Sequence, residues 1–420
     1  MSPRRPRFWS LLHPRPGRRL PLGWRARYVH RRVKALGVGL ADPGFAELLG
    51  RIDGAPPYGG NLVEVHVRGE EAFAAMRRAV AAARREVLLE AYIFSDDSTG
   101  RTLMDDLVQA AARGVEVRVL VDAVGSLGTR SSFWREMERR GVAVRLFHPL
   151  LSRVFLHPYR DHRKILVVDH QVAFTGGMNI ADEYGSARPA KGGRTWRDSH
   201  LRVEGPVARE MAAVFAEGWV HAGGQPLDLA GAPGEARGEA RVLVLESRPN
   251  RGHAESAAVL AAVVAAARQR VWITNAYFAP RRIALDILGR GAARGVDVRL
   301  LLPGKTDVPI VRHAGHGYYA GLLARGVRVF EYQPAVLHAK TVVADALVSV
   351  VGSTNLDFRS FHFNAECNLV ILDAPTGVRM EAAFRQDLEE SVEIEAEGWA
   401  RRPAYHRLGD RLARLLAPAL

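Results

Sequence analysis

The sequence contains a single cysteine, Cys367, among its 420 residues. A disulfide needs two thiols, so none can form within the chain, and a metal site built from several cysteines is excluded. The fifteen histidines include no His-Glu-x-x-His spacing, which is the arrangement found in zinc-dependent hydrolases. We therefore expect chemistry that uses no metal ion and no other cofactor.

Long apolar runs are also missing. A helix that crosses a bilayer needs about 20 apolar residues in succession, and the run at Ser256–Ala267 has only twelve. We expect that run to be a packed helix. Hydrophobic residues make up 48% of the chain, enough to fill a core, and the length allows two or three domains.

Acidic residues are absent from residues 1–40, which carry eleven arginines and lysines. The formal net charge is +14, so the rest of the chain carries only +3. Five prolines argue against one continuous helix here, and interleaved Arg and Trp suit the headgroup layer of an anionic membrane. We expect a basic arm that binds a membrane surface and is not needed for turnover. A disordered basic leader or a nucleic-acid-binding or targeting segment are the alternatives.

The strongest pattern is a motif that occurs twice at identical spacing. Each copy has a histidine, a lysine, an aspartate and an asparagine, which are His162, Lys164, Asp169 and Asn179 in the first copy and His338, Lys340, Asp345 and Asn355 in the second. Apolar residues on both sides of each aspartate predict a hairpin of two short strands. Since side chains two apart share a face of a strand, each histidine should lie beside its lysine. One copy would be a weak signal, whereas two copies 176 residues apart indicate function.

The whole chain repeats, not only the motif. Residues 265–268 and 293–299 resemble residues 81–84 and 112–118, at offsets of 184 and 181. Helical segments alternate with strands in both halves, which predicts an α/β fold with βαβ units and a largely parallel sheet. A stretch rich in Gly, Ala and Pro follows residue 222. We therefore predict an arm at 1–40, a first domain at 41–232 and a second at 233–420.

Two half-sites in a duplicated chain predict that the halves face each other and share one site around a pseudo-twofold axis, so that a monomer holds all of it. Two lysines and two amides, Lys164, Lys340, Asn179 and Asn355, would bind a phosphate diester, whose transition state gains negative charge. His162 and His338 would divide the remaining work: one attacks phosphorus, and the other moves the proton of the leaving or entering alcohol. Our hypothesis makes His162 the nucleophile.

A nucleophilic histidine also needs an acceptor on its second ring nitrogen. Asp198 and Glu366, each downstream of a motif, are the candidates for orienting the histidines. Asp169 and Asp345 complete the motifs, and we group them with the catalytic residues. Each lies seven residues beyond its histidine and beside a turn, so we expect a structural role rather than direct contact with the substrate.

The doubled motif resembles that of the phospholipase D superfamily. Other stretches are similar to the short bacterial cardiolipin synthases that lack N-terminal membrane spans, namely residues 90–94, 160–164, 196–198, 204–206 and 352–360. The resemblance covers roughly residues 60 to 418. It departs at residues 275–278, where the family usually has a proline before Tyr277 and Phe278, and at Ala346, where glycine commonly follows the aspartate. Both positions lie outside the pooled catalytic set.

The resemblance implies two α/β/α sandwich domains and a phosphatidyltransferase that works through a covalent phosphohistidine, without a metal. Its substrate would be an anionic phospholipid, phosphatidylglycerol, and its product cardiolipin. We expect the protein to be peripheral, on the cytoplasmic side of the cell membrane.

A phospholipase D-type hydrolase or a nuclease would use the same motifs. The net charge of +3 outside the arm, however, offers no strong basic stripe of the kind that binds a nucleic-acid backbone. A noncatalytic lipid-binding scaffold would predict broken motifs, and both copies are complete.

For the C-terminal helix with Leu408, Leu412 and Leu415, we expect core packing rather than membrane contact.

Overall fold

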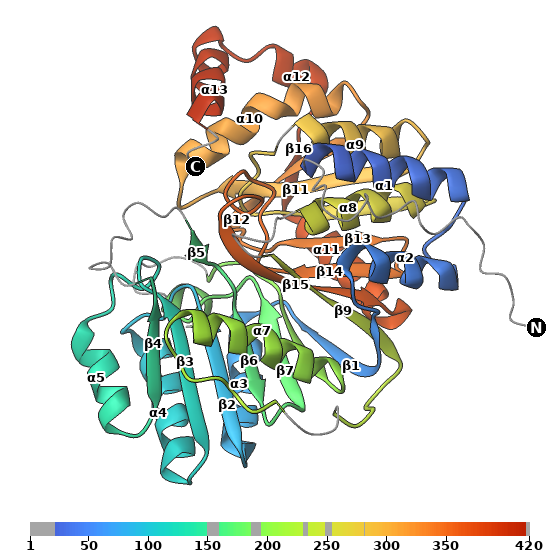
Figure 1. Cartoon of the computed structure of the whole chain (residues 1–420). Helices are drawn as coiled ribbons and strands as arrows, with labels where there is room; N and C mark the ends of the chain where they lie inside the picture. The colour runs from blue at the N-terminus through green and yellow to red at the C-terminus, as the bar shows by residue number, and fades with distance from the viewer. Residues whose placement is uncertain are drawn as a thin grey trace, which may run out of the picture.

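The computed structural model describes residues 22–148, 159–185, 195–229, 234–247, 254–280 and 282–416. Two similar α/β halves lie side by side, and one mixed sheet runs through both with helices on its two faces (Figure 1). This confirms the predicted fold class and the internal duplication. The domain boundary that we placed at residue 232 lies outside the described residues.

The elements of the first half follow the predicted order closely. They are β1 (Tyr58–His66), α3 (Gly69–Ala82), β2 (Glu86–Ala91), α4 (Ser98–Ala112), β3 (Glu116–Asp122), α5 (Ser131–Arg139), β4 (Ala143–Phe147), β5 (Arg160–Asp161), β6 (Ile165–Val168), β7 (Val172–Gly176), α6 (Asp182–Gly185), β8 (His200–Glu204) and α7 (Val207–His221).

The second half repeats this order and adds elements at its end. It contains β9 (Ala240–Ser247), α8 (Ala254–Ala266), β10 (Arg270–Thr274), α9 (Arg282–Ala292), β11 (Asp297–Lys305), α10 (Pro309–Leu323), β12 (Arg328–Val336), β13 (Thr341–Ala344), β14 (Val348–Gly352), β15 (Asn364–Leu372), α11 (Ala374–Glu389), β16 (Ser391–Glu393), α12 (Ala396–Ala400) and α13 (Ala404–Leu416). The helix α11 ends at Glu389, and β16 pairs antiparallel with β12.

The strand order displays the duplication. It runs β16-β12-β11-β10-β13-β14-β15-β9-β1-β8-β7-β6-β2-β3-β4, and β5 pairs with β15 outside this path. The antiparallel pair β9 and β1 lies at the centre, and the strands on either side of it correspond one to one, except that β16 at the edge of the second half has no counterpart. A pseudo-twofold axis therefore passes between β1 and β9.

The sheet is mixed rather than largely parallel, which corrects our expectation. Along the strand order above, only β2-β3-β4 and β10-β11-β12 are parallel. The motif hairpins β6-β7 and β13-β14 join these trios antiparallel. The helix–strand alternation correctly predicted the trios, while the hairpins supply the antiparallel part of each half.

The helices divide the core into layers. On one face, α7 and α11 cover a single hydrophobic cluster that spans both halves and includes Phe215, Trp219, Met380 and Phe384. On the other face, α3, α4 and α5 cover the first half, and α8, α9 and α10 cover the second. Because one cluster is continuous across the junction, the two halves are held together by core packing as well as by the β1-β9 pair.

The N-terminal segment differs from the predicted arm. Residues 22–36 form α1 (Leu22–Leu36), and α2 (Pro43–Asp53) follows. Both helices pack on the second half, where Ala26, Val29 and Val33 are buried in the same cluster as α8. These three apolar residues are spaced three and four apart, a helical stripe that lies between arginines in the sequence. The division at residue 40 therefore does not match the fold; residues 1–21 lie outside the described part.

The C-terminal helix differs as well. Leu408, Leu412 and Leu415 of α13 are 57%, 55% and 73% exposed, so the core packing that we expected is wrong. The helix contacts α10 through its opposite side, where Asp410 and Ala413 are buried. None of the described helices is long and apolar enough to cross a membrane.

Candidate active site

His162 and His338 line one cavity of about 360 Å³ at the junction of the halves. Asn179 and Asn355 line it too, as do Tyr92, Tyr184, Trp196 and Tyr277. The structure therefore brings together residues that are 176 positions apart in the sequence. Both imidazoles are nearly fully buried, which places them in an environment that strengthens electrostatic interactions.

Each histidine is held on the backbone of the opposite half. The short strand β5 pairs parallel to β15, and the His162 backbone amide donates to the Ala365 carbonyl at 2.9 Å. At the position related by the pseudo-twofold axis, the His338 amide donates to the Arg197 carbonyl at 2.7 Å. The positions of the two histidines therefore depend on both halves being present.

The orienting carboxylates cross in the same way. His162 Nδ1 lies 2.9 Å from Glu366 Oε2, and His338 Nδ1 lies 2.8 Å from Asp198 Oδ2. Each imidazole is thus paired with a buried carboxylate from the other half. Such a contact fixes the tautomer with the proton on Nδ1, so that the lone pair for the reaction is on Nε2. Nε2 of His338 also lies 3.2 Å from Lys340 Nζ.

The two carboxylates are not equivalent. Glu366 also accepts hydrogen bonds from the Ser353 hydroxyl at 2.5 Å and the Ser360 hydroxyl at 2.7 Å. Burial favours the protonated form, but His162 and these hydroxyls outweigh it and lower the pKa of Glu366. Asp198 accepts from the Ser199 amide at 2.7 Å, and burial raises its pKa to about 6. The first motif has Gly177 where the second has Ser353, so it has no hydroxyl there to donate to Asp198.

Burial lowers the pKa of both histidines. For His162 the Glu366 carboxylate opposes this effect, while for His338 the neighbouring ammonium groups of Lys340 and Lys164 add to it. Burial therefore favours the neutral form of both rings. A neutral imidazole is the form that can attack phosphorus.

The motif lysines lie behind the histidines. Lys164 Nζ donates to the His162 carbonyl at 2.8 Å, and Lys340 Nζ donates to the His338 carbonyl and lies 2.9 Å from its Nδ1. Neither lysine is among the residues that line the 360 Å³ cavity. Burial lowers the pKa of Lys164 to about 7 and that of Lys340 to about 8. Each ammonium thus adds positive charge beneath its imidazole.

The motif asparagines reach the cavity directly. Asn179 Nδ2 donates to the Tyr184 hydroxyl at 3.2 Å, and its Oδ1 accepts from the Ile93 amide. The Oδ1 atom of Asn355 is buried without a hydrogen-bond partner among the described residues. The two amides lie in the cavity wall, where donors to a phosphate oxygen would be needed.

Asp169 and Asp345 do not line the cavity, and grouping them with the catalytic residues does not match their position. They lie at the opposite ends of β6 and β13 from the histidines. The Asp169 carboxylate accepts the backbone amides of residues 84–86, and Asp345 accepts those of 268–270. Both have positive φ, 53° and 51°, in the hairpin turns. Their contacts are those of turn-fixing residues, as their place beside a turn suggested.

Several cavity residues did not emerge as site residues from the motif. Arg160 and Arg359 bring guanidinium groups to the wall, and Asp307 and Asp357 bring carboxyl groups. The Tyr184 hydroxyl lies 3.2 Å from His338 Nδ1. Arg160 and Arg359 fall within two of the stretches that resemble the family, which was the available signal. Tyr92 lies in another such stretch, residues 90–94. Asp307 and Tyr184 lie in none of these stretches, and only tertiary packing brings them here.

One group of side chains could ligate a metal ion, away from this cavity. Ligand atoms of His313, His316 and Asp410 lie within 4.8 Å of one another where α10 meets α13. The other Asp410 oxygen is 3.0 Å from Arg402, and His316 Nε2 is 3.0 Å from Glu331. The guanidinium already supplies positive charge to the aspartate, and these residues do not line the catalytic cavity.

Comparisons with known proteins also show the duplication. The family described as "Cardiolipin synthase, PLD-like domain" matches residues 76–188 and 260–388, one match in each half. A cardiolipin synthase from Halalkalibacterium halodurans is 35% identical over 84% of this chain and 71% of its own length. Cardiolipin synthase A from Pseudomonas aeruginosa is 36% identical over 88% of this chain and 76% of its own length.

A solved structure shares the fold at much lower identity. The phosphatidylserine synthase of Haemophilus influenzae superposes with a TM-score of 0.66 and 13% identity, over 85% of this chain and 95% of that one. A likeness at this level supports the architecture and the duplicated topology.

Proposed function

Because this chain belongs to the cardiolipin synthase family with PLD-like domains, we propose that it transfers a phosphatidyl group from one phosphatidylglycerol to the hydroxyl of a second one. The products are cardiolipin and glycerol. The observation that carries this proposal is the pair of buried imidazoles from opposite halves, which face one cavity and each contact a carboxylate through Nδ1.

In the first step, Nε2 of one histidine attacks phosphorus, and a P–N bond forms as the P–O bond to glycerol breaks. The second histidine gives its proton to the leaving oxygen, so that glycerol departs as a neutral alcohol. In the second step, the acceptor hydroxyl attacks phosphorus and the P–N bond breaks. Its proton passes to the second histidine, which restores the starting state of the enzyme.

We assign the attack to His162 and the proton transfers to His338. The ionised Glu366 behind His162 stabilises the positive charge that develops on an attacking imidazole. Asp198, whose pKa is raised to about 6, is a weaker counter-charge behind His338. A histidine with a weaker counter-charge releases its proton more readily, which suits an acid. The charge of the bound phosphodiester would favour protonation of His338 before the first step.

The positive charge around the cavity supports a phosphodiester substrate. Arg160 and Arg359 line the wall, and the two motif lysines lie beneath the histidines. The side-chain amides of Asn179 and Asn355 complete the donors. We propose that the guanidinium and amide groups hold the non-bridging oxygens, whose charge grows in the transition state, while the lysines add positive charge beneath the histidines. The site would then need no metal ion.

The direct test is to incubate purified protein with phosphatidylglycerol vesicles and identify the products. We expect cardiolipin and free glycerol in equal amounts, and a loss of at least about 10³-fold with His162→Ala or His338→Ala. Phosphatidic acid instead of cardiolipin would mean that water is the acceptor and the protein is a hydrolase. Cleavage of DNA without lipid turnover would identify a nuclease and refute the proposal.

A phospholipid transferase must also reach the bilayer, and we propose that α13 provides peripheral contact with an anionic membrane on its cytoplasmic side. Tyr405, Leu408, Leu412 and Leu415 are exposed at helical spacing, and three exposed arginines lie between them at 407, 411 and 414. Such a helix suits the interface of an anionic bilayer. The helix packs on α10, whose Val311 lines the catalytic cavity.

Vesicle sedimentation tests this contact. The variant L408S/L412S/L415S should bind phosphatidylglycerol-containing vesicles at least about 10-fold more weakly, because three leucines no longer enter the interface. The matched control L127S/V220S/V378S changes three exposed apolar residues elsewhere and should bind normally. Equal binding by the two variants would rule out α13 as the attachment.

A further inference from the structure

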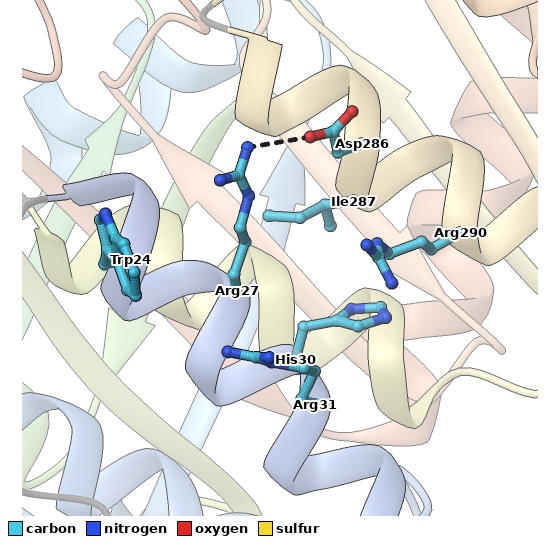
Figure 2. Close-up of a pocket in the computed structure, with 7 residues that line it drawn as sticks. All are labelled: Trp24, Arg27, His30, Arg31, Asp286, Ile287 and Arg290. Carbon is cyan, nitrogen blue, oxygen red and sulfur yellow. Dashed lines mark hydrogen bonds and ion pairs between the residues drawn. The ribbon is translucent and has the colours of Figure 1, made fainter.

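A second cavity lies between α1 and α9. It measures about 240 Å³, and Arg27 and Arg31 of α1 and Arg290 of α9 line it (Figure 2). Trp24 also lines it and is 65% exposed. None of the residues that line this basic pocket lines the catalytic cavity.

The charges of the basic pocket are unbalanced. Asp286 is the one acidic residue in its lining, and its carboxylate is 3.1 Å from Arg27 (Figure 2). Within the described ranges, the guanidinium groups of Arg31 and Arg290 form neither an ion pair nor a hydrogen bond. The backbone carbonyl of Arg290 accepts from Arg294 at 3.1 Å. Two free guanidinium groups on facing helices form a site for an anion, and arginine suits phosphate because its planar fork can donate two hydrogen bonds at once.

A buried polar atom adds a second requirement. His30 is only 3% exposed, and its Nδ1 has no hydrogen-bond partner in the described part of the chain. The ring lies beside Arg290 on the wall of the basic pocket (Figure 2). The ring also hydrogen-bonds the backbone of Ala261, and burial with Arg294 and Arg290 nearby lowers the pKa of His30 to about 4. The ring is therefore neutral, its proton is on the nitrogen that bonds Ala261, and Nδ1 is an acceptor.

We propose that the basic pocket binds the headgroup of an anionic phospholipid that carries a hydroxyl beside its phosphate. Arg31 and Arg290 hold the phosphate, and His30 Nδ1 accepts a hydrogen bond from the hydroxyl. Phosphatidylglycerol has both groups. The exposed Trp24 lies where an interfacial aromatic residue would meet the bilayer. This inference rests on the proposed function only in that it names the same class of lipid, bound at a separate place where no chemistry occurs.

The test measures binding to vesicles of phosphatidylcholine that contain either phosphatidylglycerol or phosphatidylmethanol, which has the same charge and no free hydroxyl. All proteins carry His162→Ala, so that lipid is not consumed. The variant R31Q/R290Q should bind phosphatidylglycerol vesicles roughly 10- to 30-fold more weakly, since each basic residue near an anionic surface contributes about 1 kcal/mol. The control R135Q/R139Q removes two exposed arginines of α5, whose hydrogen bonds are local, and should bind normally.

Two further variants separate the proposal from a folding defect. Asp286→Asn releases Arg27 from its ion pair and should tighten binding up to about 5-fold, an effect that misfolding would not produce. His30→Leu should remove the preference for phosphatidylglycerol over phosphatidylmethanol, which we expect to be roughly 2- to 10-fold in the parent protein, the value of one hydrogen bond. Thermal unfolding of each variant checks that it is folded.

Three outcomes would overturn the inference. One is equal vesicle binding by R31Q/R290Q and R135Q/R139Q. Another is no preference between the two lipids in the parent protein. A third is binding of inorganic phosphate that depends on Arg31 and Arg290 while vesicle binding does not depend on them. That result would make the basic pocket a site for a soluble anion. Because these measurements use inactive protein, a failure to make cardiolipin would refute the proposed function and leave the basic pocket standing.

Discussion

Single residues decide how the two histidines differ. The Glu366 carboxylate accepts hydrogen bonds from two serine hydroxyls, whereas the Asp198 carboxylate accepts one from a backbone amide. The two halves are therefore close to symmetric in backbone but not in the charge that supports each imidazole. A duplicated site can divide its labour through such changes, because a nucleophile and an acid need different pKa values.

The first prediction concerns these carboxylates. Glu366→Gln should slow formation of the phosphohistidine about 10²- to 10⁴-fold, because a neutral amide cannot stabilise the imidazolium. Asp198→Asn should instead slow both formation and breakdown of the phosphohistidine, because His338 moves a proton in both steps. Rapid-quench measurement of the covalent intermediate on His162 distinguishes the two. Ser353→Gly, which gives the second motif the residue of the first, is the mild control, with a loss below about 10-fold. An intermediate trapped on His338 would reverse the assignment.

The second prediction concerns pH. In the free enzyme Asp198 must be ionised, and its pKa is about 6; Lys164 and Lys340 must be charged, and their pKa values are about 7 and 8. We expect kcat/KM to fall below pH 6 as Asp198 gains a proton and above pH 7 to 8 as the lysines lose theirs. The alkaline limb of kcat should lie higher, because bound phosphate raises the pKa of the lysines. A flat profile between pH 5 and 9 would contradict these roles.

At the level of elements, α1 combines two tasks on two faces. Ala26, Val29 and Val33 enter the core of the second half, while Arg27 and Arg31 face the basic pocket. Deleting residues 1–40 would therefore remove a core helix as well as charge, so we no longer expect such a protein to retain normal turnover.

The third prediction tests that packing. Val33→Asp places a charge at a fully buried position and should lower the free energy of unfolding by about 3 kcal/mol or more. Ala35→Asp, two residues away and exposed, is the matched control and should cost less than about 1 kcal/mol. Urea unfolding gives both values. Similar costs at the two sites would mean that α1 is not part of the core.

At the scale of the whole molecule, the active site exists only because the halves face each other. Each histidine takes its backbone contact and its orienting carboxylate from the opposite half. The continuous sheet and the shared cluster under α7 and α11 fix that arrangement. One chain thus carries everything that we assign to the reaction.

The fourth prediction follows from this crossing. A mixture of His162→Ala and His338→Ala proteins should show no more activity than either alone, because no chain in it holds both imidazoles. Size-exclusion chromatography of the mixture should show whether chains associate. Activity restored by mixing would mean that halves are exchanged between chains and that the active unit is a dimer.

The sequence by itself determined the duplication, the hairpins β6-β7 and β13-β14, and the residues that matter most. The spacing of residues within a motif can be read directly from the sequence. The periods of apolar residues, two in a strand and between three and four in a helix, follow from backbone geometry alone. It also marked Asp198 and Glu366 as candidate acceptors. It could not say which histidine each would contact, since either pairing satisfies the same spacing.

Only the tertiary structure decided the crossed pairings, the place of α1 in the second core and the exposure of the leucines on α13. These depend on contacts between residues up to 259 positions apart, such as Arg27 with Asp286, and no local pattern encodes a partner at that distance. An apolar stripe shows that a helix has a face to bury but not what covers it. The apolar face of α1 packs against α8. The leucine face of α13 is left exposed by the described part of the chain, because the partner of each face is decided by tertiary packing.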